Sequence, residues 1–91
     1  MKTAKSKSID ILDMLKGYRG SVGTVIEDYT KIIKDTDELV TLSYTDKCIS
    51  ILAGDFHYLY IYPDNTVTCN EDGWGMSMYF EVNIFTTAMH L

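Results

Sequence analysis

The stretch that decides the fold class is KCISILAGDFHYLYIY, residues 47–62. Apolar side chains recur there with a period of two on both sides of Gly54-Asp55, a dipeptide typical of a two-residue hairpin turn. We therefore expect a β-hairpin. A two-residue turn at this position would pair Ile51 with Tyr58, and the side chains of both would lie on the same face of the sheet.

The same period extends through the C-terminal half of the chain. Strand signals rich in Val, Ile, Tyr, Phe and Thr occur at residues 39–44, 47–53, 56–62, 65–69 and 75–86. Short segments containing Asp, Asn, Gly or Pro separate them, as expected of turns. These signals predict a five-stranded antiparallel meander sheet over about residues 39–86.

A helical period replaces the strand period over about residues 8–34. Ser8 is a candidate cap for a first helix, and the pair Thr24 and Glu27 is typical of a capping box that starts a second one. The apolar stripe nevertheless keeps its register throughout, which favours one long bent helix. Both alternatives, one bent helix or two short ones, stay open.

The expected fold class is therefore α+β, with the N-terminal helical segment packed on the meander sheet. Residues 1–7 are expected to form a flexible tail, and residues 8–91 a single domain. A chain of 91 residues is long enough for one domain and no more.

Charge is distributed unevenly along the chain. The net charge is −5, and all eight basic residues lie at or before Lys47, whereas residues 48–91 contain five acidic residues and no Lys or Arg. A surface of this sign repels phosphates and attracts cations. We therefore expect no direct nucleic-acid binding, and we expect a protein partner with a basic surface.

The meander topology predicts where the acidic residues gather. Alternate turns of a meander lie at the same end of the sheet, so six carboxylates and one tryptophan should share one pole. These residues are Asp35, Asp37, Glu38, Asp55, Glu71, Asp72 and Trp74. Such a pole would steer a basic partner towards Trp74 as an apolar anchor. The competing interpretation is that turns are simply where Asp and Gly belong.

The hairpin pairing also predicts a second apolar face on the sheet, away from the helices. That face would contain Leu59, Ile61, Val67, Met76, Met78 and Phe80. An exposed apolar patch of this size is typical of an interface, either of a symmetric homodimer or with a larger protein. Alternatively, a one-residue change in the register of the last strand would turn its methionines towards the helices.

Residues that carry chemistry are few. His57 and His90 are the two histidines, and Cys48 and Cys69 lack the spacing of a metal or redox motif. We find no phosphate-binding loop and no nucleophile motif. We therefore expect no catalytic residues, no metal site, no cofactor and no enzymatic activity.

Targeting signals are also missing from the sequence. Residues 1–7 are not followed by the apolar run of a secretory signal, and no stretch approaches the roughly 20 apolar residues of a membrane span. With two cysteines and no such signal, we expect a reducing, cytoplasmic location and no membrane association.

These observations favour a small acidic interaction module that binds and inhibits or regulates a larger basic, nucleic-acid-handling protein. In size and charge the chain is similar to the compact inhibitors that phages encode against host defence or transcription. That likeness implies a viral counter-defence or host-takeover role in the host cytoplasm. One alternative is a homo-oligomeric assembly or scaffold protein using the apolar sheet face. A second is a small-ligand domain seating a nucleotide between helix and sheet near Tyr58 and Tyr60.

Overall fold

The computed structural model describes residues 3–19, 24–71 and 74–91. In chain order the elements are α1 (Ala4–Arg19), α2 (Thr24–Asp35), β1 (Val40–Tyr44), β2 (Ile49–Ala53), β3 (His57–Ile61), β4 (Thr66–Glu71), β5 (Trp74–Tyr79) and α3 (Ile84–Met89). The strands form one antiparallel sheet in the order β1-β2-β3-β4-β5. The predicted α+β class and the predicted meander are therefore confirmed.

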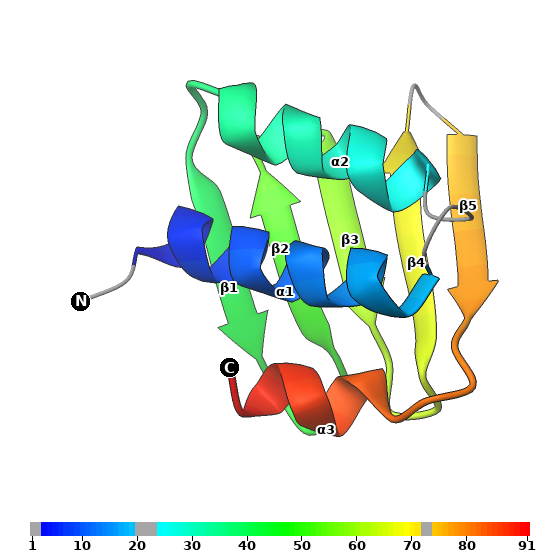
Figure 1. Ribbon diagram of the computed structural model, residues 1–91. Coiled ribbons are helices and arrows are strands. Elements are labelled where there is room, and N and C mark those ends of the chain that lie inside the picture. The colour runs from blue at the N-terminus through cyan, green and yellow to red at the C-terminus, as the bar shows by residue number, and fades with distance from the viewer. Residues whose placement is uncertain (1–2, 20–23, 72–73) are drawn as a thin grey trace.

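The molecule has two layers. The three helices lie on one face of the sheet, where α1 and α2 cross the strands in opposite directions and α3 crosses their lower end (Figure 1). No helix within the described residues is long and apolar enough to cross a membrane. The second face of the sheet carries no helix in the described part of the chain (Figure 1).

The helical region forms two helices, which decides between the two alternatives. α2 begins at Thr24, as the capping box predicts. α1 begins at Ala4, four residues before the expected cap at Ser8. The cap is Thr3, whose Oγ1 accepts a hydrogen bond of 3.0 Å from the backbone N–H of Ser6. Ser8 lies inside α1 and is fully buried.

The hairpin of β2 and β3 corrects the predicted register by one residue. Ile51 pairs with Leu59 and Ala53 with His57, because the turn contains three residues, Gly54 to Phe56, instead of two. A shift of one residue turns every side chain of β3 to the opposite face. Leu59 and Ile61 therefore face the helices, while Tyr58 and Tyr60 face away from them.

Asn70 of β4 explains how the longer turn is held. Its side-chain Oδ1 accepts a hydrogen bond of 2.7 Å from the backbone N–H of Tyr58, and its Nδ2 donates to the carbonyl of Phe56. The Asn70 amide thus bonds to the backbone on both sides of His57 and substitutes there for a strand partner. Asn70 is buried, and its bonds fix where β3 starts.

The corrected register joins the two predicted apolar faces into one core. Ile49, Ile51, Leu59, Ile61 and Val67 are fully buried in the same cluster as the inward residues of the helices. Of the six residues predicted to form an uncovered interface, Leu59, Ile61, Val67 and Phe80 are buried, and Met78 packs against this core. That part of the prediction is wrong. The side chain of Met76 lies outside the described residues.

The last predicted strand is too long, since β5 ends at Tyr79 and α3 follows. Asn83 caps α3, with its side-chain oxygen accepting from the backbone N–H of Thr86 at 3.2 Å. Ile84 and Ala88, four residues apart, are both buried against the core. An alternating sequence over residues 75–86 therefore conceals the start of α3, which Asn83 caps.

Candidate protein-interaction surface

One end of the sheet gathers acidic side chains, as the meander predicts. α2 ends at Asp35, a short segment with Asp37 and Glu38 leads into β1, and Asp55 lies in the turn between β2 and β3 (upper end in Figure 1). All four side chains are exposed. We call this surface, together with the exposed Leu39 and Phe56, the acidic end.

The remaining predicted members of the pole belong to the hairpin between β4 and β5. Glu71 pairs with Trp74, which places the hairpin at the same end of the sheet. The side chains of Glu71 and Trp74 lie outside the described residues, as does Asp72. The role predicted for Trp74 as an apolar anchor therefore stays a prediction.

Backbone contacts hold the acidic end in place. The backbone N–H of Glu38 donates to Thr36 Oγ1 at 3.1 Å, and Lys5 of α1 donates from Nζ to the Thr36 carbonyl at 3.2 Å. The N–H of Gly54 donates to the carbonyl of Leu39 at 3.0 Å, which ties the turn to the start of β1. The segment before β1 is thus bonded to α1 on one side and to the β2–β3 turn on the other.

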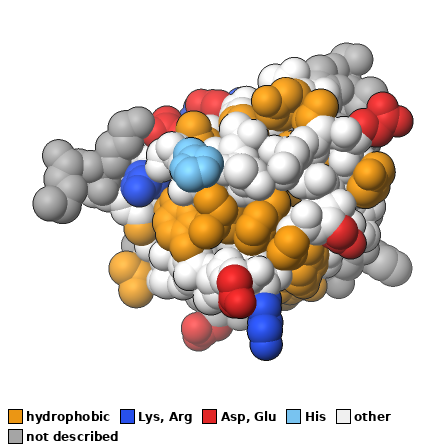
Figure 2. Space-filling model, turned by 90° about the horizontal axis from the view of Figure 1, so that it is seen from below, with side chains coloured by type: hydrophobic (Ala, Val, Ile, Leu, Met, Phe, Trp, Pro, Cys, Tyr) orange, Lys and Arg blue, Asp and Glu red, His pale blue; other side chains and the backbone are white. Residues whose placement is uncertain are grey.

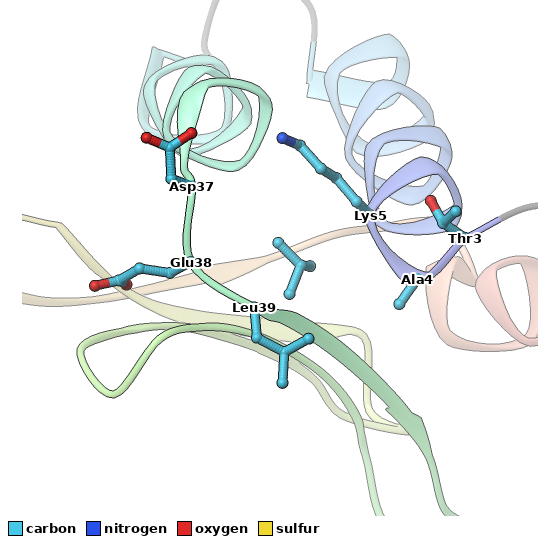
Figure 3. Close-up of a pocket in the computed structure, with 7 residues that line it drawn as sticks. Thr3, Ala4, Lys5, Asp37, Glu38 and Leu39 are labelled. Atoms are coloured by element: carbon cyan, nitrogen blue, oxygen red, sulfur yellow. The ribbon is translucent and has the colours of Figure 1, made fainter.

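Glu38 lies against Gly54, where the backbone conformation favours glycine. Gly54 has a φ of 60°, and the position of an added Cβ would lie 1.8 Å from Glu38 Oε2. Figure 3 shows the Glu38 side chain directed away from Lys5. The absent Cβ therefore leaves the space that the Glu38 carboxylate occupies above the turn.

The carboxylates of the acidic end are not neutralised by partners. Within residues 3–19, 24–71 and 74–91, no ion pair involves Asp35, Asp37, Glu38 or Asp55. Lys5 is the cation that lines the neighbouring pocket, and its ammonium bonds to the Thr36 carbonyl. These four charges are therefore open to a cation from outside the molecule.

Two apolar side chains stand among these charges. Leu39 is 80% exposed, and Phe56 is 53% exposed. Leu39 directly follows Glu38 in the chain, and Phe56 directly follows Asp55. Neither residue was predicted as a surface anchor, because the strand signals at residues 39–44 and 56–62 include both of them. The available signal was their position immediately after an acidic residue.

A shallow pocket of about 550 Å³ opens beside the acidic end. Its lining comes from the first turn of α1 and from the segment leading into β1, namely Thr3, Ala4, Lys5, Asp37, Glu38, Leu39 and Val40. Figure 3 shows Lys5 reaching across from α1 towards that segment, while Leu39 extends in a different direction. The pocket combines one amine, two carboxylates and apolar walls, and it suits a side chain of a protein better than a buried ligand.

The uncovered face of the sheet carries hydroxyl and aromatic groups. Tyr58 and Tyr60 stack with ring centroids 5.1 Å apart, and Tyr62 follows at 6.3 Å. The sequence predicts that a nucleotide-binding site near Tyr58 and Tyr60 would lie between helix and sheet. That location is wrong, because these rings lie on the face opposite the helices.

The opposite end of the sheet differs in composition. Figure 2 views the molecule from that side and shows hydrophobic atoms surrounded by both acidic and basic side chains. Its partly exposed apolar residues include Tyr44, Val82, Met89 and Leu91, and Lys7 lies 5.6 Å from the centre of the Tyr44 ring. Charges of both signs give this end no clear electrostatic preference for a partner.

The described part of the chain contains no assembled metal or redox site. No group of three or more His, Cys, Asp or Glu residues there could hold a metal ion. Cys48 and Cys69 are not joined in a disulfide; Cys48 directly precedes β2, and Cys69 lies on β4, with β3 between those two strands. His57 lies at the start of β3, and its Nδ1 is buried without a hydrogen-bond partner among the described residues.

Comparisons with known proteins add no family. No family model, curated protein or solved structure matches this chain.

Proposed function

We propose that this protein is a small interaction module that binds a larger basic protein through its acidic end. The observation that carries the proposal is the grouping of Asp35, Asp37, Glu38 and Asp55, exposed and without ion pairs among the described residues, around exposed apolar side chains. Charged rims steer association and select partners, whereas apolar side chains supply affinity once water is displaced. The acidic end contains both.

The chemistry of the partner follows from the charge. A basic surface that binds the phosphates of nucleic acid would also attract these carboxylates. The partner class we propose is therefore a nucleic-acid-handling protein. Binding there would cover the partner's phosphate-binding surface and inhibit it. A counter-defence or host-takeover role in the cytoplasm of a host cell is consistent with such inhibition and belongs to the same proposal.

The proposal is tested with three immobilised baits. The first is the wild-type protein, the second carries Asp37→Asn and Glu38→Gln, and the third carries Asp64→Asn and Glu81→Gln. The last pair removes the same charge at the opposite end of the sheet, where both residues are also exposed. Cell lysate is passed over each bait at about 50 mM and about 300 mM salt.

We expect basic proteins to be retained by the wild type and by the Asp64/Glu81 variant at low salt and released at high salt. The Asp37/Glu38 variant should retain at least about fivefold less, because exposed charges act mainly through steering and rim contacts. A captured protein should also lose its affinity for nucleic acid when the wild-type module is added. Equal capture by all three baits would contradict the proposal.

A further inference from the structure

β1 is an edge strand whose outward backbone groups can be assigned from the hydrogen bonds at its two ends. The N–H of Gly54 donates to the Leu39 carbonyl, and the N–H of Thr45 donates to the Cys48 carbonyl. Antiparallel pairing alternates between residues that bond to the neighbour and residues that do not. Val40, Leu42 and Tyr44 therefore direct their N–H and C=O groups away from β2.

Those groups are available for pairing. β1 is the terminal strand of the sheet, and no hydrogen bond from another described segment reaches the backbone of Val40, Leu42 or Tyr44. Protected edge strands carry Lys, Pro or a bulge. The sequence of β1, VTLSY, has none of these, and it pairs with β2 residue for residue.

The surroundings of this edge favour a particular kind of strand. The pocket between the first turn of α1 and residues 37–40 adjoins the start of β1 and has room for a side chain of an added strand. Asp35, Asp37 and Glu38 precede the same strand and are exposed. An added strand therefore meets negative charge at this end, which favours lysine or arginine in its flanks.

A second copy of this chain gains no net charge complementarity at the same edge. Two β1 strands pairing antiparallel about Leu42 would place Glu38 of one copy opposite Asp46 of the other, and Asp37 opposite Lys47. The repulsive and the attractive pairs offset each other. A segment with lysine or arginine in its flanks meets attraction at the acidic residues before β1, and charge therefore favours that segment over a second copy.

We propose that β1 accepts an extended, basic segment of the partner protein as an additional strand of the sheet. This inference rests on the proposed function and specifies how the partner is held. Backbone bonds from Val40, Leu42 and Tyr44 give affinity, and the acidic residues before β1 select basic flanks.

The probe is the synthetic peptide Lys-Lys-Val-Thr-Val-Thr-Lys-Lys, which carries lysines at both ends and fits either strand direction. A second peptide has the same sequence with N-methyl groups on its four central residues, and it keeps the charge but cannot donate backbone hydrogen bonds there. Binding to the full chain is measured by calorimetry, and protection of individual amides by hydrogen exchange.

We expect the methylated peptide to bind at least about tenfold more weakly, since strand addition depends on main-chain bonds. The parent peptide should protect the amides of Val40, Leu42 and Tyr44. The amide of Ser77, which points outward on the β5 edge, should not change. Equal binding of both peptides, protection at Ser77 instead of β1, or no binding of the parent peptide would each overturn strand addition.

A pair of variants gives an independent measurement. Tyr44→Pro removes an outward N–H from β1, and Ser77→Pro removes one from β5. We expect about a tenfold loss of affinity in the first and none in the second. Should Tyr44→Pro fail to fold, the methylated peptide still decides the outcome.

The two proposals fail in different ways. Binding that falls in the Asp37/Glu38 variant but survives methylation supports a basic partner and overturns strand addition. A peptide-free protein that sediments as a dimer with Val40, Leu42 and Tyr44 already protected would show that a second copy fills the edge, which also overturns it.

Discussion

The two ends of the sheet use similar polar residues in different ways. At the end opposite the acidic end, Thr45 Oγ1 accepts from the backbone N–H of Cys48, and Asp64 Oδ1 accepts from that of Thr66. Asn65 Oδ1 accepts from Phe85 N–H, and Asn83 caps α3. These side chains hold the turns. At the acidic end, Thr36 and Asn70 hold the backbone in the same way, but the four exposed carboxylates accept no backbone hydrogen bond from the described residues.

This difference separates two reasons for placing polar residues in turns. A side chain that bonds to the backbone stabilises its own loop, and its removal costs folding free energy. A side chain that bonds to nothing in the described structure contributes little to folding. Its charge is therefore free to serve binding. The contrast between the two ends predicts a set of measurable effects.

The largest expected effect is at Asn65, which lies at the structural end. Its φ is 68°, and its side chain bonds to the N–H of Phe85. We expect Asn65→Ala to lower the free energy of unfolding by about 2–3 kcal/mol, since it loses the hydrogen bond and forces Ala into the left-handed region. Asn65→Gly should lose about 1 kcal/mol, because Gly tolerates this φ. Urea denaturation measures the free energy of unfolding of both variants. Equal losses would refute the claim that the left-handed conformation adds to the cost of Asn65→Ala.

Gly54 is the position where the acidic end does constrain folding. We expect Gly54→Ala to cost about 1–2 kcal/mol, because Ala is disfavoured at a φ of 60° and its Cβ meets the Glu38 carboxylate. In a background of Glu38→Ala, the part of this cost that comes from the contact with Glu38 should disappear. The part that comes from the unfavourable φ should remain. A double-mutant cycle separates them. A coupling of zero would mean that Glu38 moves aside at no cost.

Tyr29 provides a reference between the two ends. Its hydroxyl donates to the carbonyl of Ile51 at 3.1 Å inside the core. We expect Tyr29→Phe to lower the free energy of unfolding by about 1 kcal/mol at neutral pH. Burial raises the pKa of the Tyr29 hydroxyl above its ordinary value of 10.0.

The sign of the pH dependence follows from that shift. Above about pH 10 the unfolded chain loses the Tyr29 proton while the folded chain keeps it, so stability falls as pH rises. The Tyr29→Phe variant should lack this contribution to the pH dependence, so its free energy of unfolding should fall less than that of the wild type between pH 9 and pH 11. Unfolded tyrosine titrates in about this range. Identical pH profiles for the two proteins would contradict it.

The smallest expected effects compare one aspartate from each end. Asp64→Ala removes an acceptor for the N–H of Thr66 and should cost about 0.5–1 kcal/mol. Asp37→Ala removes no such bond and should change stability by less than about 0.5 kcal/mol. Thermal unfolding of the two variants side by side gives the difference. A larger loss in Asp37→Ala would end the distinction between a structural end and a binding end.

The fold class was predictable because it depends on periodicity. Apolar residues alternate with a period of two after Asp35, and a capping box occurs at Thr24. Both patterns are local signals, and the strands and α2 occur where these patterns predict them. The position of the acidic end followed from topology alone, since a meander brings alternate turns together. Neither inference needed the register of a single hairpin.

The assignment of faces was not predictable for a specific reason. Gly54-Asp55 is compatible with a two-residue turn, and nothing local shows that Phe56 belongs to the turn as well. The deciding contact is the amide of Asn70, 14 residues away from Phe56 in the chain. One residue of difference moved Leu59 and Ile61 from a predicted interface into the core.

The most direct test of a binding role for the acidic end is a titration of the lysine-flanked peptide. It compares the wild type, the variant with Asp37→Asn and Glu38→Gln, and the variant with Asp64→Asn and Glu81→Gln at low salt. We predict at least about a fivefold loss of affinity in the Asp37/Glu38 variant and a change below about twofold in the Asp64/Glu81 variant. Equal losses in both variants would contradict the account, because net charge, not the acidic end, would then govern binding.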